Sequence, residues 1–282
     1  MTHSLKAKAK ARTGALAVTR TVVFIGALAL LTPLSASAYF PLITDDTGTQ
    51  GKGGHQIELD YVYSRDTNDV FDDDGRVVDS TADRSSTFPM TYTYGVTDNL
   101  DAFIGVVRQV NAVGGWLNTG LGVKWNFAGK QDSGWSFAVK PTLLLPVSKT
   151  MQANGLGSAA TNWQVNLIAS YIATTHELHL NAGYSSNRYA QLPDSDPQRT
   201  HLWSVSAAPV LILNPQWKLA LDMGFQSNPS LSSHYLAFGE VAVIYAPIKN
   251  LQLGLGLMGS TALNARDNAK GLTLLGGLTY QF

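Results

Sequence analysis

The last twelve residues, 271–282, constrain the fold most strongly, because two kinds of side chain alternate along them. One face carries Leu272, Leu274, Gly276, Leu278, Tyr280 and Phe282, and the other carries Thr273, Leu275, Gly277, Thr279 and Gln281. A period of two is that of a β-strand. A strand that ends the chain on an apolar aromatic is typical of the closing strand of a membrane-spanning barrel, whose outer face contacts lipid. A half-buried terminal strand of a soluble domain would show the same alternation, so this stretch alone leaves both folds open.

Residues 1–38 have the organisation of a cleaved secretory signal. Basic residues lead into an apolar run over 21–31, and the sequence Ala36-Ser37-Ala38 precedes Tyr39. The run is too short to span a bilayer as a helix, which needs about 20 apolar residues. The sequence therefore predicts export across an inner membrane and cleavage after Ala38.

The composition excludes several classes of function. Five of the 20 Lys and Arg residues and none of the 20 Asp and Glu residues lie in the predicted signal, so the mature chain carries an excess of five negative charges. Such a chain has no bulk attraction for nucleic acid. The chain contains no cysteine, which excludes disulfides and thiolate metal sites. Charged residues make up 14% of the chain, against roughly 25% in soluble domains, so we expect part of its surface to face something other than water.

Twelve alternating runs follow one another from His55 to the end of the chain, and the fourth, 117–127, is among the clearest. Their connectors also alternate. The links at 96–99, 173–176, 213–216 and 247–250 are tight, whereas those at 65–84, 149–161 and 188–199 are long and polar. Aromatic residues gather at the strand ends, as Trp125, Phe127, Trp135, Trp163, Trp217, Tyr245, Tyr280 and Phe282. An even number of strands joined by short turns at one end and long loops at the other is the pattern of outer-membrane barrels.

These patterns predict an all-β fold, a membrane-spanning antiparallel up-and-down β-barrel of about 12 strands over residues 55–282. We expect it in the bacterial outer membrane, in contact with lipid and lipopolysaccharide. We expect Leu278, Tyr280 and Phe282 to form the signal that the barrel-assembly machinery reads. The tight turns and both termini are predicted to face the periplasm.

Residues 39–54 form a different kind of segment, which we call the leader. It is rich in Gly, Thr and Asp and shows no alternation, so it is expected to be irregular. The motif Thr44-Asp45-Asp46-Thr47, together with the turn sequence from Tyr92 to Leu100, resembles the family of outer-membrane proteins associated with the meta-cleavage pathway of phenol degradation. The resemblance implies a barrel that transports small aromatic molecules.

Three patterns suggest other chemistry. His176 and His179 resemble a metal-binding pair, but a separation of three residues places them on opposite faces of a strand. Asp69, Asp72, Asp73, Asp74 and Gly75 resemble a calcium loop without the usual first and last ligands, so a solvated acidic loop is expected, and loose binding of divalent cations stays open. Some barrels of this size are phospholipases with a His-x-Ser pair, which is absent from the mature chain, although Ser and His side chains could still meet across strands. No enzyme, metal or cofactor is therefore predicted.

The remaining candidates face the inside of the predicted barrel. The lumen and transport candidates are Glu58, Asp60, Asp101, Phe103, Lys124, Lys140, His179, Lys218, Asp222, Phe238 and Glu240. Glu177, Leu144 and Leu236 share the inward face. Such residues suit either a transport path for a small hydrophobic or aromatic solute or a packed network of ion pairs that fills a narrow barrel. A passive channel is the leading hypothesis, and a lipid-modifying hydrolase and a structural barrel with a plugged lumen are the alternatives.

The leader gives one further expectation. It begins at the periplasmic mouth of a barrel whose inward face carries Lys124, Lys140 and Lys218. Opposite charges attract strongly in a confined, partly desolvated space. The leader is therefore expected to fold back and constrict the lumen, with Asp45 and Asp46 near lumen bases or amides; the alternative is a flexible tail.

Overall fold

The computed structural model describes residues 40–71, 77–111, 113–190, 198–231, 233–263 and 268–282. The predicted signal, 1–38, and Asp72 to Gly75 of the acidic segment lie outside these ranges. Among the described residues, no helix is long and apolar enough to cross a membrane.

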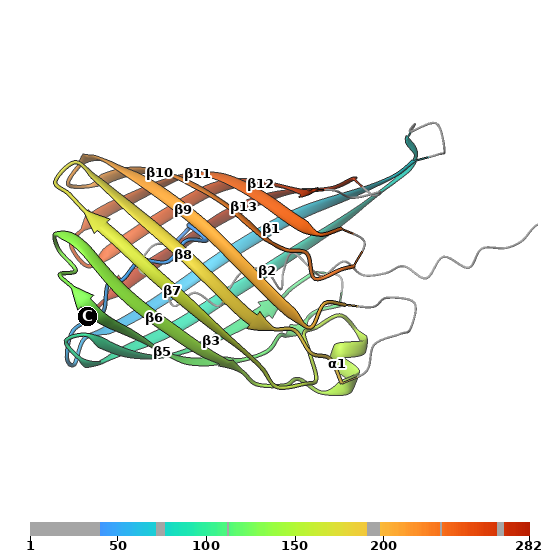
Figure 1. Ribbon diagram of the computed structural model, residues 1–282, viewed down its shortest axis with the longest axis horizontal. Helices are drawn as coiled ribbons and strands as arrows, with labels where there is room; N and C mark the ends of the chain where they lie inside the picture. Colours follow the sequence, from blue (N-terminus) through green and yellow to red (C-terminus); the bar gives the residue numbers. More distant parts are fainter. Residues whose placement is uncertain (1–39, 72–76, 112, 191–197, 232, 264–267) are drawn as a thin grey trace, which may run out of the picture.

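The described chain forms a single sheet that closes on itself (Figure 1). Its strands are β1 (His55–Phe71), β2 (Val77–Thr97), β3 (Leu100–Gln109), β4 (Gly115–Trp116), β5 (Gly120–Gly129), β6 (Gly134–Leu144), β7 (Asn162–Ile172), β8 (His176–Ser186), β9 (His201–Asn214), β10 (Trp217–Ser227), β11 (Tyr235–Ile248), β12 (Leu251–Leu263) and β13 (Asn268–Gln281). All pairings are antiparallel, and β1 pairs with both β2 and β13. The two-residue β4 pairs only with the end of β3. The twelve long strands therefore form a closed antiparallel barrel, which confirms the predicted fold class.

The connectors divide the barrel into two ends. At the turn end, short links at 98–99, 130–133, 173–175, 215–216 and 249–250 join neighbouring strands. At the loop end, the described links are longer and include the helix α1 (Lys149–Ala153), which Ser148 caps by accepting a hydrogen bond from the backbone N–H of Met151. This division agrees with the predicted pattern of connectors.

The strands alternate because one face lines the barrel and the other surrounds it. In β10 the outward side chains Leu221, Met223 and Phe225 are 45–51% exposed, whereas the inward Ala220 and Asp222 are each 1% exposed. Large apolar side chains cover the outside of nearly every strand in this way. A continuous apolar exterior is unfavourable in water, and it matches the lipid-facing surface of a transmembrane barrel.

Aromatic rings form contacts near both ends of the barrel. The pairs near the turn end are Trp125 with Phe127, Trp135 with Tyr171, Trp217 with Tyr245, and Tyr280 with Phe282. The pairs near the loop end are Tyr61 with Phe88, Trp163 with Tyr184, and Trp203 with Tyr235. Two such bands correspond to the aromatic girdles that lie at the two membrane interfaces.

The last strand closes the barrel at its turn end. The backbone of Phe282 exchanges two hydrogen bonds with His55, and the two rings stack with centroids 5.1 Å apart. Tyr280 and Phe282 are 42% and 55% exposed on the outside, while Gln281 lies on the inward face and donates a hydrogen bond to Gln56. Leu278, on the same face as the two aromatics, is partly exposed.

Two expectations about the strands were wrong. The segment 65–84 is not a long loop, because β1 extends to Phe71 and β2 begins at Val77, and Figure 1 shows this hairpin projecting beyond the other strands. Residues 65–69 and 79–84 are almost all polar, so no alternation reveals these strand ends, yet their backbones pair. The fourth strand begins at Gly120 rather than at residue 117, since Leu117 turns inward and packs, 8% exposed, against Val107 and Leu156.

Candidate functional site

The leader lies inside the barrel and follows its inner wall (Figure 1). Thr44 contacts Asp222 of β10, and Gln50 contacts Asp101 of β3 at the other end of the segment. Thr44 also contacts β9, and Asp45 and Thr47 contact side chains of β8, β7, β6 and β5. Gly53 and Gly54 exchange backbone hydrogen bonds with Gly95 of β2. The backbone N–H groups of Thr44, Asp45, Thr47 and Gln50 donate instead to polar side chains of the wall. Thr44, Asp45, Asp46 and Thr47 are each at most 5% exposed.

Two buried lysines hold the acidic pair of the leader. Lys140 Nζ lies 2.6 Å from Asp45 Oδ2, and Lys124 Nζ lies 3.7 Å from Asp45 Oδ1 and 3.4 Å from Asp46 Oδ1. All four side chains are at most 7% exposed. Removing one partner of such a buried pair typically costs about 3–5 kcal/mol, because the other charge stays buried without compensation. The ion pairs therefore hold the leader against the inner wall at β5 and β6.

Hydrogen bonds on both sides of these pairs define one position for the leader. Thr44 donates from its backbone N–H and from Oγ1 to the two carboxylate oxygens of Asp222, at 2.7 and 2.6 Å. Asn181 accepts from the N–H of Asp45 at 3.0 Å and donates to its carbonyl at 2.8 Å. The N–H of Gln50 donates to both oxygens of Asp101, each at 3.1 Å.

A second polar chain runs along the wall beneath Thr47. Ser170 Oγ lies 2.9 Å from His179 Nδ1, and His179 Nε2 lies 3.4 Å from Glu177 Oε2. Lys218 Nζ donates to Glu177 Oε1 at 2.9 Å, so this lysine pairs with the wall. The order Ser, His, Glu is that of a hydrolytic triad. Ser170, however, is 1% exposed and accepts a hydrogen bond from the N–H of Thr47, so an acyl substrate would reach it only if the leader left.

His176 and His179 lie on opposite faces of β8: His176 is exposed and His179 is fully buried. No group of three or more metal-ligating side chains occurs in the described part of the chain.

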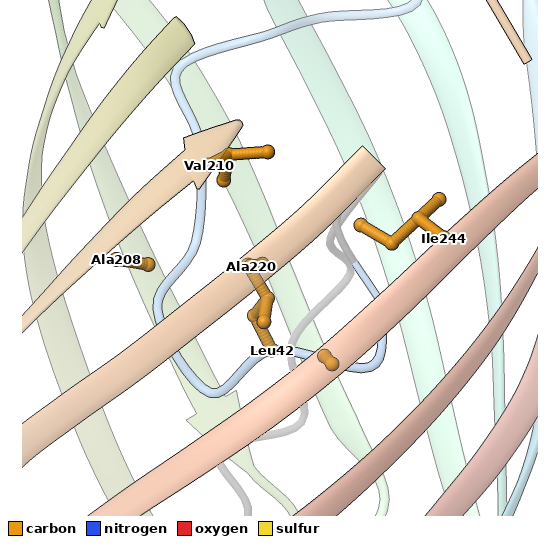
Figure 2. Close-up of a cluster of buried hydrophobic side chains, with 6 residues drawn as sticks. Leu42, Ala208, Val210, Ala220 and Ile244 are labelled. Carbon is orange, nitrogen blue, oxygen red and sulfur yellow. The ribbon is translucent and has the colours of Figure 1, made fainter. Parts of the chain in front are cut away.

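The inner wall also carries apolar surface. Leu42 packs against Ala208 and Val210 of β9, Ala220 of β10, and Ala242 and Ile244 of β11. Figure 2 shows Leu42 of the leader beside Ala220, with Val210 and Ile244 on the neighbouring strands. These residues lie in the turn-end halves of three neighbouring strands. We call them the apolar strip.

A second apolar cluster continues the inner surface toward β1. It consists of Val62, Met258 and Leu275, with Phe40, Ile43 and Phe238 packed against them. Of the apolar residues expected inside, Phe103 and Leu236 are buried, and Phe238 and Leu144 are partly exposed. Lys140 lies over the ring of Phe103, 5.1 Å from its centroid. The lysines that bind the leader therefore lie on β5 and β6, and most of the apolar inner surface lies on β9 to β13, which also carry the buried carboxylates of Asp222 and Glu240.

Sequence reasoning missed the apolar strip. Its signal was present, because β9 and β11 carry apolar residues on both faces. A strand of a membrane barrel that is apolar on both faces must place one apolar face inside.

Three more acidic candidates are Glu58 and Asp60 of β1 and Glu240 of β11. Glu58 is 1% exposed and Glu240 is 3% exposed. Glu240 lies opposite Asp222 in the β10–β11 register. Neither carboxylate oxygen of Glu240, nor Oδ1 of Asp60, has a hydrogen-bond partner among the described residues. A buried polar atom without a partner costs stability, so these groups are not explained by packing alone.

A cavity of about 120 Å³ lies on the loop-end side of the leader. Its walls come from the loop-end halves of β7, β8, β9, β10 and β11, and Ile43 of the leader contributes to its lining. The inward-facing side chains around it include Gln164, Asn166, Asn181, Ser204, Ser206, Gln226 and Phe238. No residue that lines the cavity carries a formal charge.

Solved structures of outer-membrane proteins share this architecture. The crystal structure of an outer-membrane channel from Pseudomonas putida F1 aligns with a TM-score of 0.66 at 15% sequence identity, over 84% of this chain and 98% of that chain. KdgM porin aligns with a TM-score of 0.50 at 11% identity, over 80% and 99% of the two chains. A FadL homologue from Pseudomonas aeruginosa aligns with a TM-score of 0.48 at 9% identity, over 81% and 90%.

No family model and no curated protein sequence matches the chain. At these identities the similarity establishes the fold and not the cargo. The chain thus has the closed β-barrel fold of an outer-membrane channel, with a short N-terminal segment bound inside its lumen.

Proposed function

We propose that this protein is a passive channel of the bacterial outer membrane for small hydrophobic or aromatic molecules. The observation that carries the proposal is the apolar surface inside the lumen, which consists of two clusters: the apolar strip, with Val210 and Ile244 near the turn end, and the cluster of Val62, Met258 and Leu275, with Phe238 beside the cavity. Apolar side chains on an inner wall contribute little to the passage of ions, whereas they make favourable contacts with a hydrophobic or aromatic solute.

The charged residues of the lumen have a different role in this proposal. Lys124 and Lys140 are neutralised by Asp45 and Asp46, so they do not offer a free positive surface to an anionic solute. Their role is to hold the leader, together with Asp101, Asp222 and His179 with its partners. Glu58, Asp60, Glu240 and Lys218 complete the polar part of the wall.

For a solute to pass, the part of the leader that packs on the apolar strip must be displaced. Leu42 makes mainly apolar contacts there, whereas Thr44 to Gln50 are held by ion pairs and hydrogen bonds. Apolar contacts can be exchanged for contacts with an apolar solute at little cost. We therefore infer that the segment before Thr44 moves aside while the rest of the leader stays bound, so that the leader constricts the lumen without sealing it.

The orientation and processing of the chain follow from the same proposal. Cleavage of residues 1–38 after export would leave the leader at the start of the mature chain, close to the turn end. The turn end would face the periplasm and the loop end lipopolysaccharide. The outward Leu278, Tyr280 and Phe282 would engage the barrel-assembly machinery. An association with phenol degradation is an implication of sequence resemblance and belongs to the same proposal.

Solute uptake by cells with an intact lipopolysaccharide layer tests the function, because that layer slows the entry of hydrophobic molecules. Expression of the protein in a strain without its major porins should raise the initial rate of labelled toluene uptake and leave glucose uptake nearly unchanged. Ile244→Gln places an amide on the apolar strip and should lower the toluene rate several-fold, whereas Ile244→Leu, the matched apolar control, should not. Equal toluene uptake with and without the protein would instead favour a structural barrel with a plugged lumen.

A further inference from the structure

We propose that the cavity on the loop-end side of the leader is a binding site for one small, uncharged, ring-shaped molecule that carries at least one hydrogen-bonding group. This inference rests on the proposed function and deepens it, because it names the class of solute that the channel holds before passage. The site is separate from the apolar strip, which lies on the turn-end side.

Three polar side chains around the cavity make no hydrogen bonds within the described part of the protein. Gln164 of β7, Ser204 of β9 and Gln226 of β10 make no side-chain hydrogen bond to other described residues, and their exposure is intermediate, so their polar groups are open to the cavity. Each can both donate and accept. Three such groups on three strands around one small space are an arrangement that a hydrogen-bonding ligand could satisfy.

Two other polar residues are held in place by the leader. Asn181 bonds both backbone groups of Asp45 and accepts from Asn166 at 2.6 Å, and Ser206 Oγ lies within hydrogen-bond distance of Thr44 Oγ1, at 2.7 Å. These contacts form the polar floor of the cavity. The site therefore exists in this shape only while the leader is bound.

The apolar part of the lining suits a ring. Phe238 and Ile43 meet at one side of the cavity, where both also pack against the cluster of Val62, Met258 and Leu275. Gly224 faces Phe238 across the β10–β11 register, and a Cβ there would lie 2.6 Å from the ring, so a glycine is needed for the ring to occupy this position. The volume of about 120 Å³ is close to the roughly 150 Å³ of an engineered cavity that binds benzene.

The lining predicts which solutes are preferred. A hydrocarbon would leave the amides and the hydroxyl without partners once it displaced their water, which lowers affinity. A carboxylate would enter a lining without a compensating positive charge, which disfavours an ion. A neutral aromatic alcohol satisfies both parts of the site. Benzyl alcohol should therefore bind better than toluene and better than benzoate.

Ligand-observed NMR titration of the purified full-length mature protein in detergent measures these affinities directly. We expect benzyl alcohol to bind at least fivefold more tightly than toluene or benzoate, a ratio in line with one or two satisfied hydrogen bonds. The double substitution Ser204→Ala with Gln226→Leu should abolish this preference or reverse it in favour of toluene. Gln216→Leu, in the turn at 215–216, is the matched control and should behave as wild type.

The outcomes separate the site from the channel. If benzyl alcohol binds no better than toluene, or if the double variant keeps the wild-type preference while it shows the wild-type heat-modifiable mobility of a folded barrel, the site is refuted. If the preference is as expected but toluene and benzyl alcohol do not enter cells faster with the protein than without it, the binding site stands and the channel function fails. If the double variant does not fold, Phe238→Leu is the second test. It removes the aromatic ring from the cavity and should lower the affinity for benzyl alcohol and for toluene more than the affinity for cyclohexanol.

Discussion

The buried pair of Asp45 and Lys140 allows a quantitative test of how the leader is held. In Asp45→Asn the side chain keeps its shape but loses its charge, and Lys140 and Lys124 remain 4% and 3% exposed. Lys124 keeps Asp46 at 3.4 Å, whereas the 2.6 Å contact of Lys140 loses its ionic character. The expected loss is about 3–5 kcal/mol, the typical cost of breaking a buried pair.

This loss of stability should affect the attachment of the leader and not the folding of the barrel. The leader is attached to the wall mainly by side chains, so its detachment relieves the unpaired charge, and the loss should appear as local opening. Hydrogen exchange of the peptide that covers residues 40–54 reports this opening, because the N–H groups of Thr44, Asp45, Thr47 and Gln50 all donate to wall side chains. At 1.4 kcal/mol per tenfold change, their exchange should accelerate roughly 100-fold or more, up to the rate of a free peptide.

Two controls sharpen the result. Asp69→Asn removes an ion pair with Lys270 that spans 4.0 Å and whose lysine is 58% exposed, so it should change leader exchange by less than about fivefold. Adding Lys140→Met to Asp45→Asn should cost much less than the sum of the two single changes, since the two opposite charges of this contact are then removed together. Leader exchange in Asp45→Asn within threefold of wild type would refute the account of these ion pairs.

Three further predictions concern stability, assembly and orientation. Glu240→Gln removes a 3%-exposed carboxylate whose oxygens have no hydrogen-bond partner among the described residues, so the midpoint of urea unfolding in lipid vesicles should rise; a fall would show that the charge stabilises the barrel. Phe282→Ala should impair membrane insertion, measured by heat-modifiable mobility, more than Gln281→Ala does, because only the first faces lipid; equal insertion would contradict this. A cysteine at Asp73 should react with an impermeant thiol reagent on whole cells and one at Asn99 should not, and the reverse would overturn the orientation.

The fold could be predicted from the sequence because its main constraint is local. Residues such as Leu221 and Met223 must face lipid while Asp222 faces the lumen, so apolar and polar residues alternate in the sequence of the strand. The same reasoning failed where that constraint is absent. The hairpin around Arg65 and Arg84 is polar on both faces, and its pairing depends on backbone hydrogen bonds that no side-chain pattern records.

The candidate site could be predicted only in part. The parity of the strands placed Lys124, Lys140 and Asp222 on the inner wall, and the charges of the leader suggested lysine partners for Asp45 and Asp46. The identity of each partner depends on the order in which the leader crosses the strands, which is a three-dimensional property. For this reason Lys218 was grouped with the other two lysines, although it pairs with Glu177.

The central claim is that the leader constricts an otherwise continuous lumen, and single-channel conductance in planar bilayers tests it most directly. Deletion of residues 39–52, with the signal retained, should leave a folded barrel with a conductance several-fold above that of the full mature protein. Benzyl alcohol should reduce the current through the full protein more than through the deletion variant, because the floor of the cavity belongs to the leader. A correctly folded deletion variant whose conductance equals that of the full protein would contradict the claim.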